Sequence, residues 1–232
     1  MFDLFTKPLF WIVTVVTCLV VVFVRSYSRR LTMQRILNAM SQQKFDKVFK
    51  TLDSFICKSF FTAIDRERLR LDTYVLMANA DKIREQFNLM LNMRISKKEK
   101  ADIYVKAFYF YLDERDNRRA KEMVGKMKGY VDETTYSQCK LICDIVADRS
   151  TAYINVLEES LKGREAGYDR GMFHYLLGIS YGNQGNKKEQ IEHLRIAKKD
   201  MKDTPYEVRI NKILKNLYNK KVISAVILLF LS

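Results

Sequence analysis

Apolar residues at helical spacing, interrupted by short polar turns, recur along most of this chain and constrain its fold more than any other feature. The turns are centred near residues 43, 80, 116, 149 and 185, so successive centres lie 33 to 37 residues apart. Between the turns, apolar residues recur every three or four positions, which is typical of helices that bury one face. A helix pair of this length cannot bury both faces alone. We therefore expect neighbouring pairs to share a continuous core.

The last helix pair, residues 171–205, carries the most specific pattern. Its two helical segments meet at Gly185-Asn186, where a tight turn requires a positive φ. Gly178 has no side chain, so the two helices can approach closely there, and Ala197 serves the same purpose from the second helix. The full pattern consists of Leu177-Gly178, Tyr181, Gly185, Leu194 and Ala197.

This pattern resembles the tetratricopeptide repeat, a helix–turn–helix unit of about 34 residues. Residues 97–129 also match it, with Ala120 at the small position. The period extends over about residues 30–205. Four positions depart from the family pattern, which usually has a tryptophan, a second aromatic, a small residue and an earlier proline there: His174, Lys187, Gln190 and Pro205. The resemblance implies an all-α fold of antiparallel helix hairpins stacked as a TPR-like solenoid.

In this family the first helices of successive hairpins line a concave groove that binds peptides. Matched by offset, the resemblance places eight residues in such a groove: Asp102, Val105, Tyr109, Asp113, Met172, Tyr175, Ile179 and Asn183. For the aromatic residues among them, packing between helices is an equally good interpretation. The mixture of apolar and acidic groups suits a peptide with apolar anchors and some basic charge.

The same periodicity predicts which side chains are buried in the less regular pairs. It assigns Leu37 and Phe55 to the buried faces of the pair at 31–56. In the pair at 66–93 it assigns Leu76 and Met77, and in the pair at 133–161 it assigns Val156.

Leu9–Val24 form an uncharged apolar run, slightly shorter than the ~20 residues that span a typical bilayer. A cleaved signal peptide is the competing interpretation, but the run lacks a positive leading segment and a small-x-small cleavage site. A buried core helix is disfavoured because the run has no polar face. We therefore expect a transmembrane helix over residues 9–25.

The residues that flank this run predict its orientation. Lys7 precedes it, Trp11 fits an interface position, and Arg25, Arg29 and Arg30 follow it. The excess of positive charge on the C-terminal side predicts a single-pass protein whose C-terminal domain faces the cytoplasm. The arginines serve as stop-transfer charges or contact anionic headgroups.

The expected order along the chain follows from these features. A short tail covers residues 1–8, the membrane helix 9–25, and about five helix pairs 30–204. Residues 205–232 are expected to form a capping helix with an apolar tail. That tail is too short to cross a bilayer, so packing on the end of the array is favoured over membrane contact.

Neither metal nor cofactor chemistry is indicated. Cys139 and Cys143 stand four residues apart, but no second pair at ligand spacing completes a zinc site. His174 and His193 lack carboxylates arranged for acid–base work, and the chain has no phosphate-binding loop or nucleophile motif. We therefore expect neither an enzyme nor a cofactor.

The formal net charge of +14 leaves a second function class open. Basic chains bind nucleic acid or anionic surfaces, but here Lys and Arg are scattered among 27 acidic residues. The favoured hypothesis is a membrane-tethered adaptor that binds a protein or peptide in its groove. The alternative is a helical repeat protein that binds nucleic acid or an anionic membrane surface. A third possibility is a domain that assembles membrane proteins or copies of itself.

Overall fold

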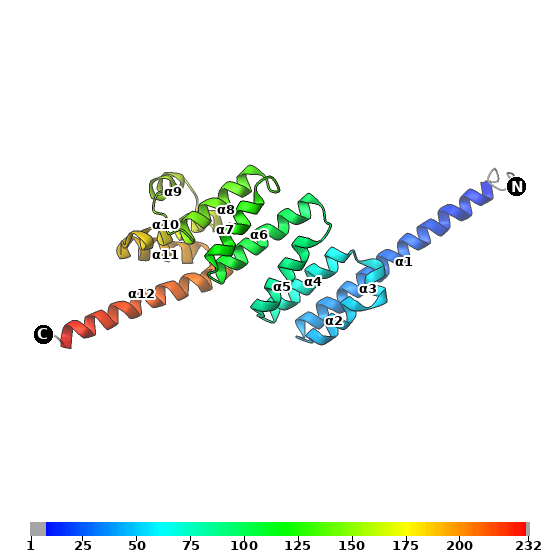
Figure 1. The fold of residues 1–232 in the computed structure, drawn as a ribbon, viewed down its shortest axis with the longest axis horizontal. Coiled ribbons are helices and arrows are strands. Elements are labelled where there is room, and N and C mark those ends of the chain that lie inside the picture. The colour runs from blue at the N-terminus through cyan, green and yellow to red at the C-terminus, as the bar shows by residue number, and fades with distance from the viewer. Residues whose placement is uncertain (1–7, 231–232) are drawn as a thin grey trace. The chain divides into compact units, whose positions relative to one another are not determined.

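The computed structural model describes the backbone of residues 8–230 and the side chains of residues 10–217. Lys7 and most of the expected N-terminal tail lie outside the described residues. The described part contains helices and no strands, which confirms the all-α class (Figure 1). The helices are α1 (Pro8–Ser41), α2 (Phe45–Asp53), α3 (Phe55–Phe60), α4 (Ala63–Leu76), α5 (Ala80–Asn92), α6 (Lys97–Asp113), α7 (Asn117–Met127), α8 (Glu133–Val146), α9 (Ile154–Leu161), α10 (Tyr168–Gln184), α11 (Lys187–Asp200) and α12 (Pro205–Phe230).

The chain divides into two compact units, residues 1–103 and 104–232, and the division falls within α6. In the first unit, α1, α2 and α3 share one core, formed by Ile36, Ala39, Met40, Val48, Leu52, Cys57 and Phe61. Helices α4 and α5 pack against each other and bury Ile64, Leu71, Ile83, Phe87 and Met90. Gln86 is buried as well, and its amide donates to the backbone oxygen of Glu67 at 3.2 Å.

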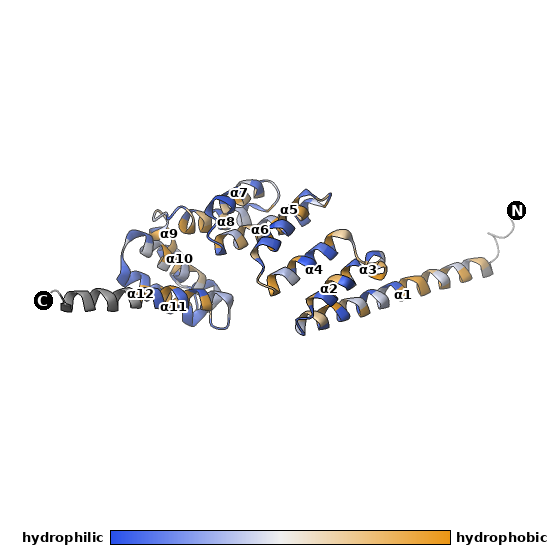
Figure 2. Cartoon of the chain, turned by 60° about the horizontal axis from the view of Figure 1, so that its bottom comes forward, coloured by the Kyte–Doolittle hydropathy of each residue, from blue (hydrophilic) through white to orange (hydrophobic). Residues whose placement is uncertain are grey.

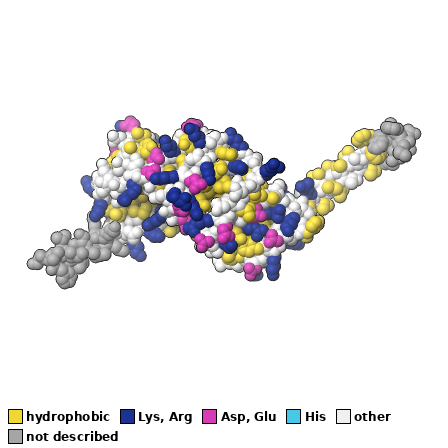
Figure 3. All heavy atoms as spheres, viewed as in Figure 1, with side chains coloured by type: hydrophobic (Ala, Val, Ile, Leu, Met, Phe, Trp, Pro, Cys, Tyr) yellow, Lys and Arg dark blue, Asp and Glu magenta, His cyan; other side chains and the backbone are white. Residues whose placement is uncertain are grey.

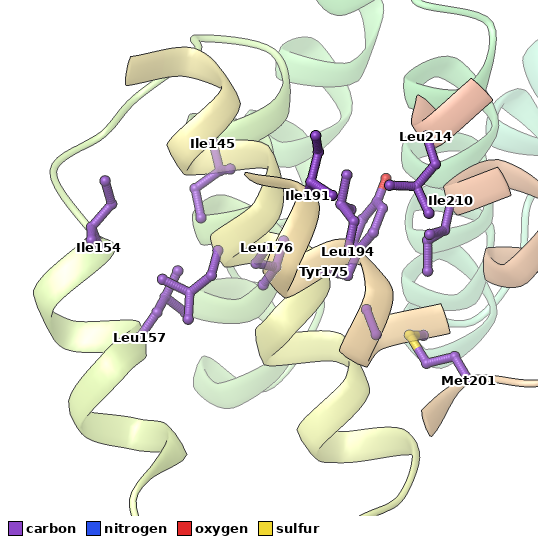
Figure 4. Packing of buried hydrophobic residues seen from close by; sticks show 12 residues of the cluster. Ile145, Ile154, Leu157, Tyr175, Leu176, Ile191, Leu194, Met201, Ile210 and Leu214 are labelled. Carbon is purple, nitrogen blue, oxygen red and sulfur yellow. The ribbon is translucent and has the colours of Figure 1, made fainter. Parts of the chain in front are cut away.

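In the second unit, the helices from α8 to α12 share one core. Side chains from these helices converge on α10 (Figure 4): Ile145, Ile154, Leu157, Tyr175, Leu176, Leu177, Ile191, Leu194, Ala197, Met201, Ile210 and Leu214. Ile210 and Leu214 belong to α12, and the start of this helix packs against α11. Helix α12 continues to Phe230, but the side chains of the apolar tail lie outside the described residues.

Close packing of α10 on α11 depends on Gly178. A Cβ atom placed on Gly178 would lie 2.7 Å from Cγ of Leu194, which is closer than real Cβ contacts come. Ala197 is fully buried on the facing helix. The predicted close approach at these two residues is therefore present in the structure.

The turns repeat one backbone geometry at the predicted intervals. Gln43, Ala78, Arg115, Arg149 and Gly185 each have a positive φ, between 51° and 86°. After four of them, all but Arg149, the next residue donates its N–H to a carbonyl five residues earlier, as in a Schellman cap. In three of these turns that next residue also caps the following helix through its side chain, namely Asn79, Asp116 and Asn186. The recurring cap makes the chain helical-repeat-like over these turns.

Several predicted buried positions are wrong. Leu37, Phe55, Leu76, Met77 and Val156 are all exposed. Leu76 and Met77 fall where α4 ends in its turn, so they leave the periodic face of the helix. Val156 lies on α9, which has only eight residues and buries Ile154 and Leu157 instead.

Helix α1 is longer than the expected membrane segment. It runs without a break from Pro8 to Ser41, through residues 25–30, where the sequence predicts the boundary between anchor and repeat domain. The segment Phe10–Ser41 is long and apolar enough to cross a membrane, and its most apolar window is entirely unburied. It is the one such helix among the described residues. In unit 1 this bare helix projects beyond α2 and α3 (Figure 1).

Candidate functional site

The second unit contains a pocket of about 590 Å³, a size typical of ligand and side-chain sites. Its wall is formed by α6, α8, α10, the start of α12 and the loop before α10. The lining is mainly aromatic and aliphatic: Tyr109, Gln138, Leu141, Ile142, Arg164, Tyr168, Asp169, Met172, Phe173, Leu176 and Tyr206. A pocket of this composition can take an apolar group and orient it with a few polar contacts.

Tyr206, in the first turn of α12, is the centre of an aromatic cluster at the pocket. Its ring meets Tyr168 and Tyr175 edge-on, with centroid distances of 6.3 Å and 5.3 Å. Burial raises the pKa of the Tyr206 hydroxyl. Edge-to-face contacts hold aromatic rings in defined orientations. The pocket wall is therefore preorganised on the side of α12.

An ion pair next to the aromatic cluster links α12 to α6. The Arg209 guanidinium pairs with the carboxylate of Asp113 and also lies over the ring of Tyr206, 5.5 Å from its centroid. The ion pair fixes the first turns of α12 against the end of α6, while the contact with Tyr206, within α12, holds the guanidinium in place. The charge of Asp113 is thereby compensated within the chain.

A second arginine lies at the edge of the pocket. The guanidinium carbon of Arg164 is 4.2 Å from the ring centroid of Phe173, within the range of a cation–π contact. Its Nε donates to the backbone oxygen of Ser160 at 2.6 Å. Arg164 is exposed to solvent. It therefore offers a positioned positive charge beside an apolar pocket.

Tyr109 forms the α6 side of the pocket. Burial, together with a hydrogen bond to Cys139, raises the pKa of its hydroxyl to about 12. Burial also raises the pKa of the Cys139 thiol to about 11. Both groups are therefore neutral at physiological pH, and Cys139 is not an activated nucleophile.

The structure brings together only two of the eight predicted groove residues at this pocket, Tyr109 and Met172. Tyr175 is buried in the core and Ile179 packs against the same core. Val105 is partly buried on α6. Asn183 has a structural contact, since its amide donates to the backbone oxygen of Ile145 at 2.8 Å.

The acidic residues of the predicted groove are both engaged in ion pairs. Asp102 belongs to the first unit, where its carboxylate lies 3.6 Å from the Arg68 guanidinium. Asp113 pairs with Arg209 in the second unit. These pairs weaken the expectation that the groove attracts basic charge.

Sequence reasoning missed most of the pocket, above all Arg164, Tyr168, Phe173 and Tyr206. Arg164 lies in the loop before α10, Tyr168 and Phe173 lie in the first turns of α10, and Tyr206 lies in the first turn of α12. Tyr168 and Met172 are four residues apart, so they share a face of α10, and that spacing was a usable signal. No sequence pattern indicates Tyr206 as a pocket residue, because its contact with Tyr168 joins two different helices, α12 and α10.

The two histidines lie outside the pocket. The Nδ1 atoms of His174 and His193 are 2.8 Å apart, and Tyr181 stacks on the ring of His193. Burial, aided by the neighbouring His193, lowers the pKa of His174 to about 4. Across the described residues, no group of three or more His, Cys, Asp and Glu side chains is arranged to hold a metal ion.

The predicted membrane-flanking residues lie along the exposed surface of α1. Trp11 is 58% exposed and packs edge-on against Phe10. Arg25, Arg29 and Arg30 are exposed as well, and Arg29 pairs with Asp65 of α4 at 3.4 Å.

The basic side chains do not gather into one patch on the face shown in Figure 3. Lys and Arg lie among Asp and Glu there, whereas hydrophobic side chains cover the described part of the projecting helix. Comparison with known proteins adds no further constraint: no protein-family model, curated protein or solved structure matches this chain.

Proposed function

We propose that this chain is a membrane-anchored adaptor that binds a segment of a partner protein in the pocket of its second unit. In this proposal α1 crosses the bilayer once, and the helix pairs stack as a TPR-like solenoid. The pocket of about 590 Å³, with aromatic rings on several sides, is the observation that carries the proposal. It is lined for an apolar group and lies beside a positioned arginine.

The chemistry of the pocket defines the partner segment. Leu141, Ile142 and Met172 supply aliphatic surface, while Tyr206 and Phe173 supply rings. Burying one large apolar side chain in such a site contributes about 1.5–3 kcal/mol. The anchor of the partner is therefore an aromatic or large aliphatic side chain.

The charged residues at the pocket determine which partner residues are favoured beside the apolar anchor. Because Asp102 and Asp113 are each paired, the exposed Arg164 at the pocket is the more accessible charge. Asp169 also lines the pocket and opposes strong selection for acidic groups. We expect a modest preference for a carboxylate close to the apolar anchor, in place of the basic flank expected from the groove residues.

A peptide array on the full chain in detergent micelles tests the proposal. The peptides vary one anchor position among Ala, Leu, Met and Phe, with Asp or Lys beside it, and fluorescence anisotropy measures binding. Tyr168→Ala and Arg164→Glu change exposed residues of the pocket. Val156→Ala, on the exposed face of α9, is the matched control.

We expect peptides with Leu, Met or Phe to bind, and Tyr168→Ala to weaken them about tenfold, as for the loss of a buried contact of about 1.4 kcal/mol. Arg164→Glu should reverse the preference for Asp over Lys. Equal binding of the Ala series, or equal loss in Val156→Ala, contradicts the pocket assignment.

The nucleic-acid or anionic-surface alternative makes a different prediction. Binding driven by phosphate contacts falls steeply as salt rises, whereas an apolar anchor resists salt. A salt titration of the peptide complex and of a duplex DNA probe separates the two. Binding of DNA that is insensitive to Tyr168→Ala and lost in salt supports the alternative.

A further inference from the structure

We propose that α3 is a second membrane contact, in which Phe55 and Ile56 insert among the headgroups of the bilayer that α1 spans. This inference rests on the proposed anchoring of α1. It concerns a surface of the first unit, separate from the pocket.

The start of α3 presents two large apolar side chains outward, followed by the exposed polar side chains of Lys58 and Ser59. Cys57 and Phe61 turn inward and are 0% and 4% exposed, which fixes the orientation of this short helix. The hydroxyl of Ser54 accepts from the N–H of Cys57 at 3.2 Å and caps its first turn. Phe55 and Ile56 consequently point outward, 84% and 50% exposed.

Phe55 is the most exposed large apolar side chain among the described residues. Single exposed apolar residues are common on protein surfaces. Two such residues in succession, on a helix whose opposite face is already buried, are left uncovered by the described residues of unit 1. A surface outside the unit is therefore the natural place to cover them.

The position of α3 identifies that surface. Helix α3 lies at the end of unit 1 from which the bare part of α1 projects, and it carries hydrophobic colour there (Figure 2). The ring of Phe61, directly after α3, lies 5.2 Å from the guanidinium carbon of Arg29 on α1. The C-terminal end of α3 thus lies beside the Arg29 side chain, and Phe55 and Ile56, at the start of this six-residue helix, lie within ~9 Å of that end along its axis.

The depth of Arg29 follows from helix geometry. Arg29 is five residues beyond Val24, or ~7.5 Å along the axis, and each headgroup layer is about 5–7 Å thick. The apolar run from Leu9 to Val24 is ~24 Å long, about 6 Å less than the hydrocarbon core, so the residues after Val24 are drawn toward the lipid. Arg29 and the end of α3 therefore lie at headgroup level.

Basic charge predominates around α3, since the nearby carboxylates of Asp53 and Asp65 are paired with Arg70 and Arg29. Lys58 is exposed on α3, and Arg25, Arg29 and Arg30 are exposed on the adjoining part of α1. Basic side chains at this depth attract anionic headgroups. Aromatic and aliphatic groups beside them are typical of a helix that lies in the interface.

Tryptophan fluorescence of the full chain in vesicles tests the inference. Trp11 is the one tryptophan of the chain and reports the anchor itself. A second protein combines Trp11→Phe with Phe55→Trp, and a third combines Trp11→Phe with Val156→Trp as an exposed control far along the sequence. Each is reconstituted in phosphatidylcholine, with and without phosphatidylserine, and in the same lipids carrying bromine on the acyl chains near the headgroup.

We expect loss of emission in brominated lipid for the wild-type chain and for the Phe55→Trp variant, with a blue-shifted maximum. The Val156→Trp variant should keep its emission. Added phosphatidylserine should increase the loss for Phe55→Trp. Because Phe55 is so exposed, its replacement leaves the core intact.

The outcomes separate the inference from the anchoring on which it rests. If Trp11 is quenched while Phe55→Trp behaves as Val156→Trp does, the anchor stands and the α3 contact is overturned. A blue shift of the Phe55→Trp emission without quenching by brominated lipid means that protein, and not lipid, covers this position, as in pairing of two copies. That result also overturns the α3 contact. If Trp11 is not quenched, both the anchoring and the α3 contact fail.

Discussion

His174 and His193 face each other with their Nδ1 atoms 2.8 Å apart, across the contact between α10 and α11. At this distance one Nδ1 carries a proton and donates it to the other. Two imidazolium rings would instead place two N–H groups against each other. The pair is therefore stable only while at least one ring is neutral.

This arrangement predicts acid sensitivity of the second unit. Burial lowers the pKa of His174 to about 4, and burial also lowers the pKa of His193, partly offset by Glu189, Glu158 and Glu192. Both folded-state pKa values are below the ordinary value of 6.5. The unfolded chain thus binds more protons, and stability present above pH 6.5 is lost as the pH falls toward 4.

The expected loss is about 1–2 kcal/mol between pH 7 and pH 5, reduced for the partial solvent exposure of both rings. Urea unfolding of the full chain in micelles, followed by near-ultraviolet circular dichroism, measures it. The His174→Gln variant is the control and should show a flatter pH profile in this window. The same slope in both proteins would assign the effect to other groups.

The contact between Gly178 and Leu194 predicts the cost of one added methyl group. Gly178→Ala places a Cβ 2.7 Å from Leu194 Cγ and should destabilise the protein by about 1–2 kcal/mol, despite the better helix propensity of alanine. Gly125→Ala is the matched control, because α7 leaves open space there. That control should be neutral or more stable by up to about 1 kcal/mol. Equal effects of the two changes would contradict the close approach.

The repeated turns predict a stabilising substitution. Ala78 has a φ of 51°, a conformation that costs an L-residue about 1–2 kcal/mol and costs glycine much less. Ala78→Gly should therefore raise the free energy of unfolding by about 0.5–1 kcal/mol. Gly185→Ala, at a φ of 86°, should lower it by a similar amount. Chemical denaturation of both variants beside the wild type measures the difference, and a loss of stability in Ala78→Gly would refute the argument.

The charge asymmetry around α1 predicts its orientation. With Arg25, Arg29 and Arg30 on the cytoplasmic side, a C-terminal tag should resist protease in intact cells and become sensitive after permeabilisation. A tag on the N-terminus of the same chain is the matched control and should behave in the opposite way. Digestion of the C-terminal tag in intact cells reverses the assignment.

The sequence predicts the repeating part of this fold well and the pocket poorly, for physical reasons. Turns depend on local residues, so Asn79, Asp116 and Asn186 are recognisable as caps from their neighbours alone. The pocket depends on contacts between distant segments. Tyr109 and Tyr206 line it together, and no local pattern relates α6 to α12.

Helix periodicity also fails where a helix is short or ends. Phe55 fits an apolar face that continues from α2, but the chain breaks at Ser54 and starts a new helix in another direction. The new helix buries Cys57 and turns Phe55 outward. One break between two helices thus converts a predicted core residue into a surface feature.

The unbroken course of α1 has a mechanical consequence. From Val24 to Ser41 the helix rises by ~26 Å, with no flexible joint between the apolar run and the first turn of unit 1. A domain on a flexible tether samples a wide volume around its anchor. In the proposed membrane-spanning arrangement, the tilt and rotation of α1 would directly set the distance of unit 1 from the bilayer and its orientation. A change in bilayer thickness that tilts α1 would then reorient unit 1 as well.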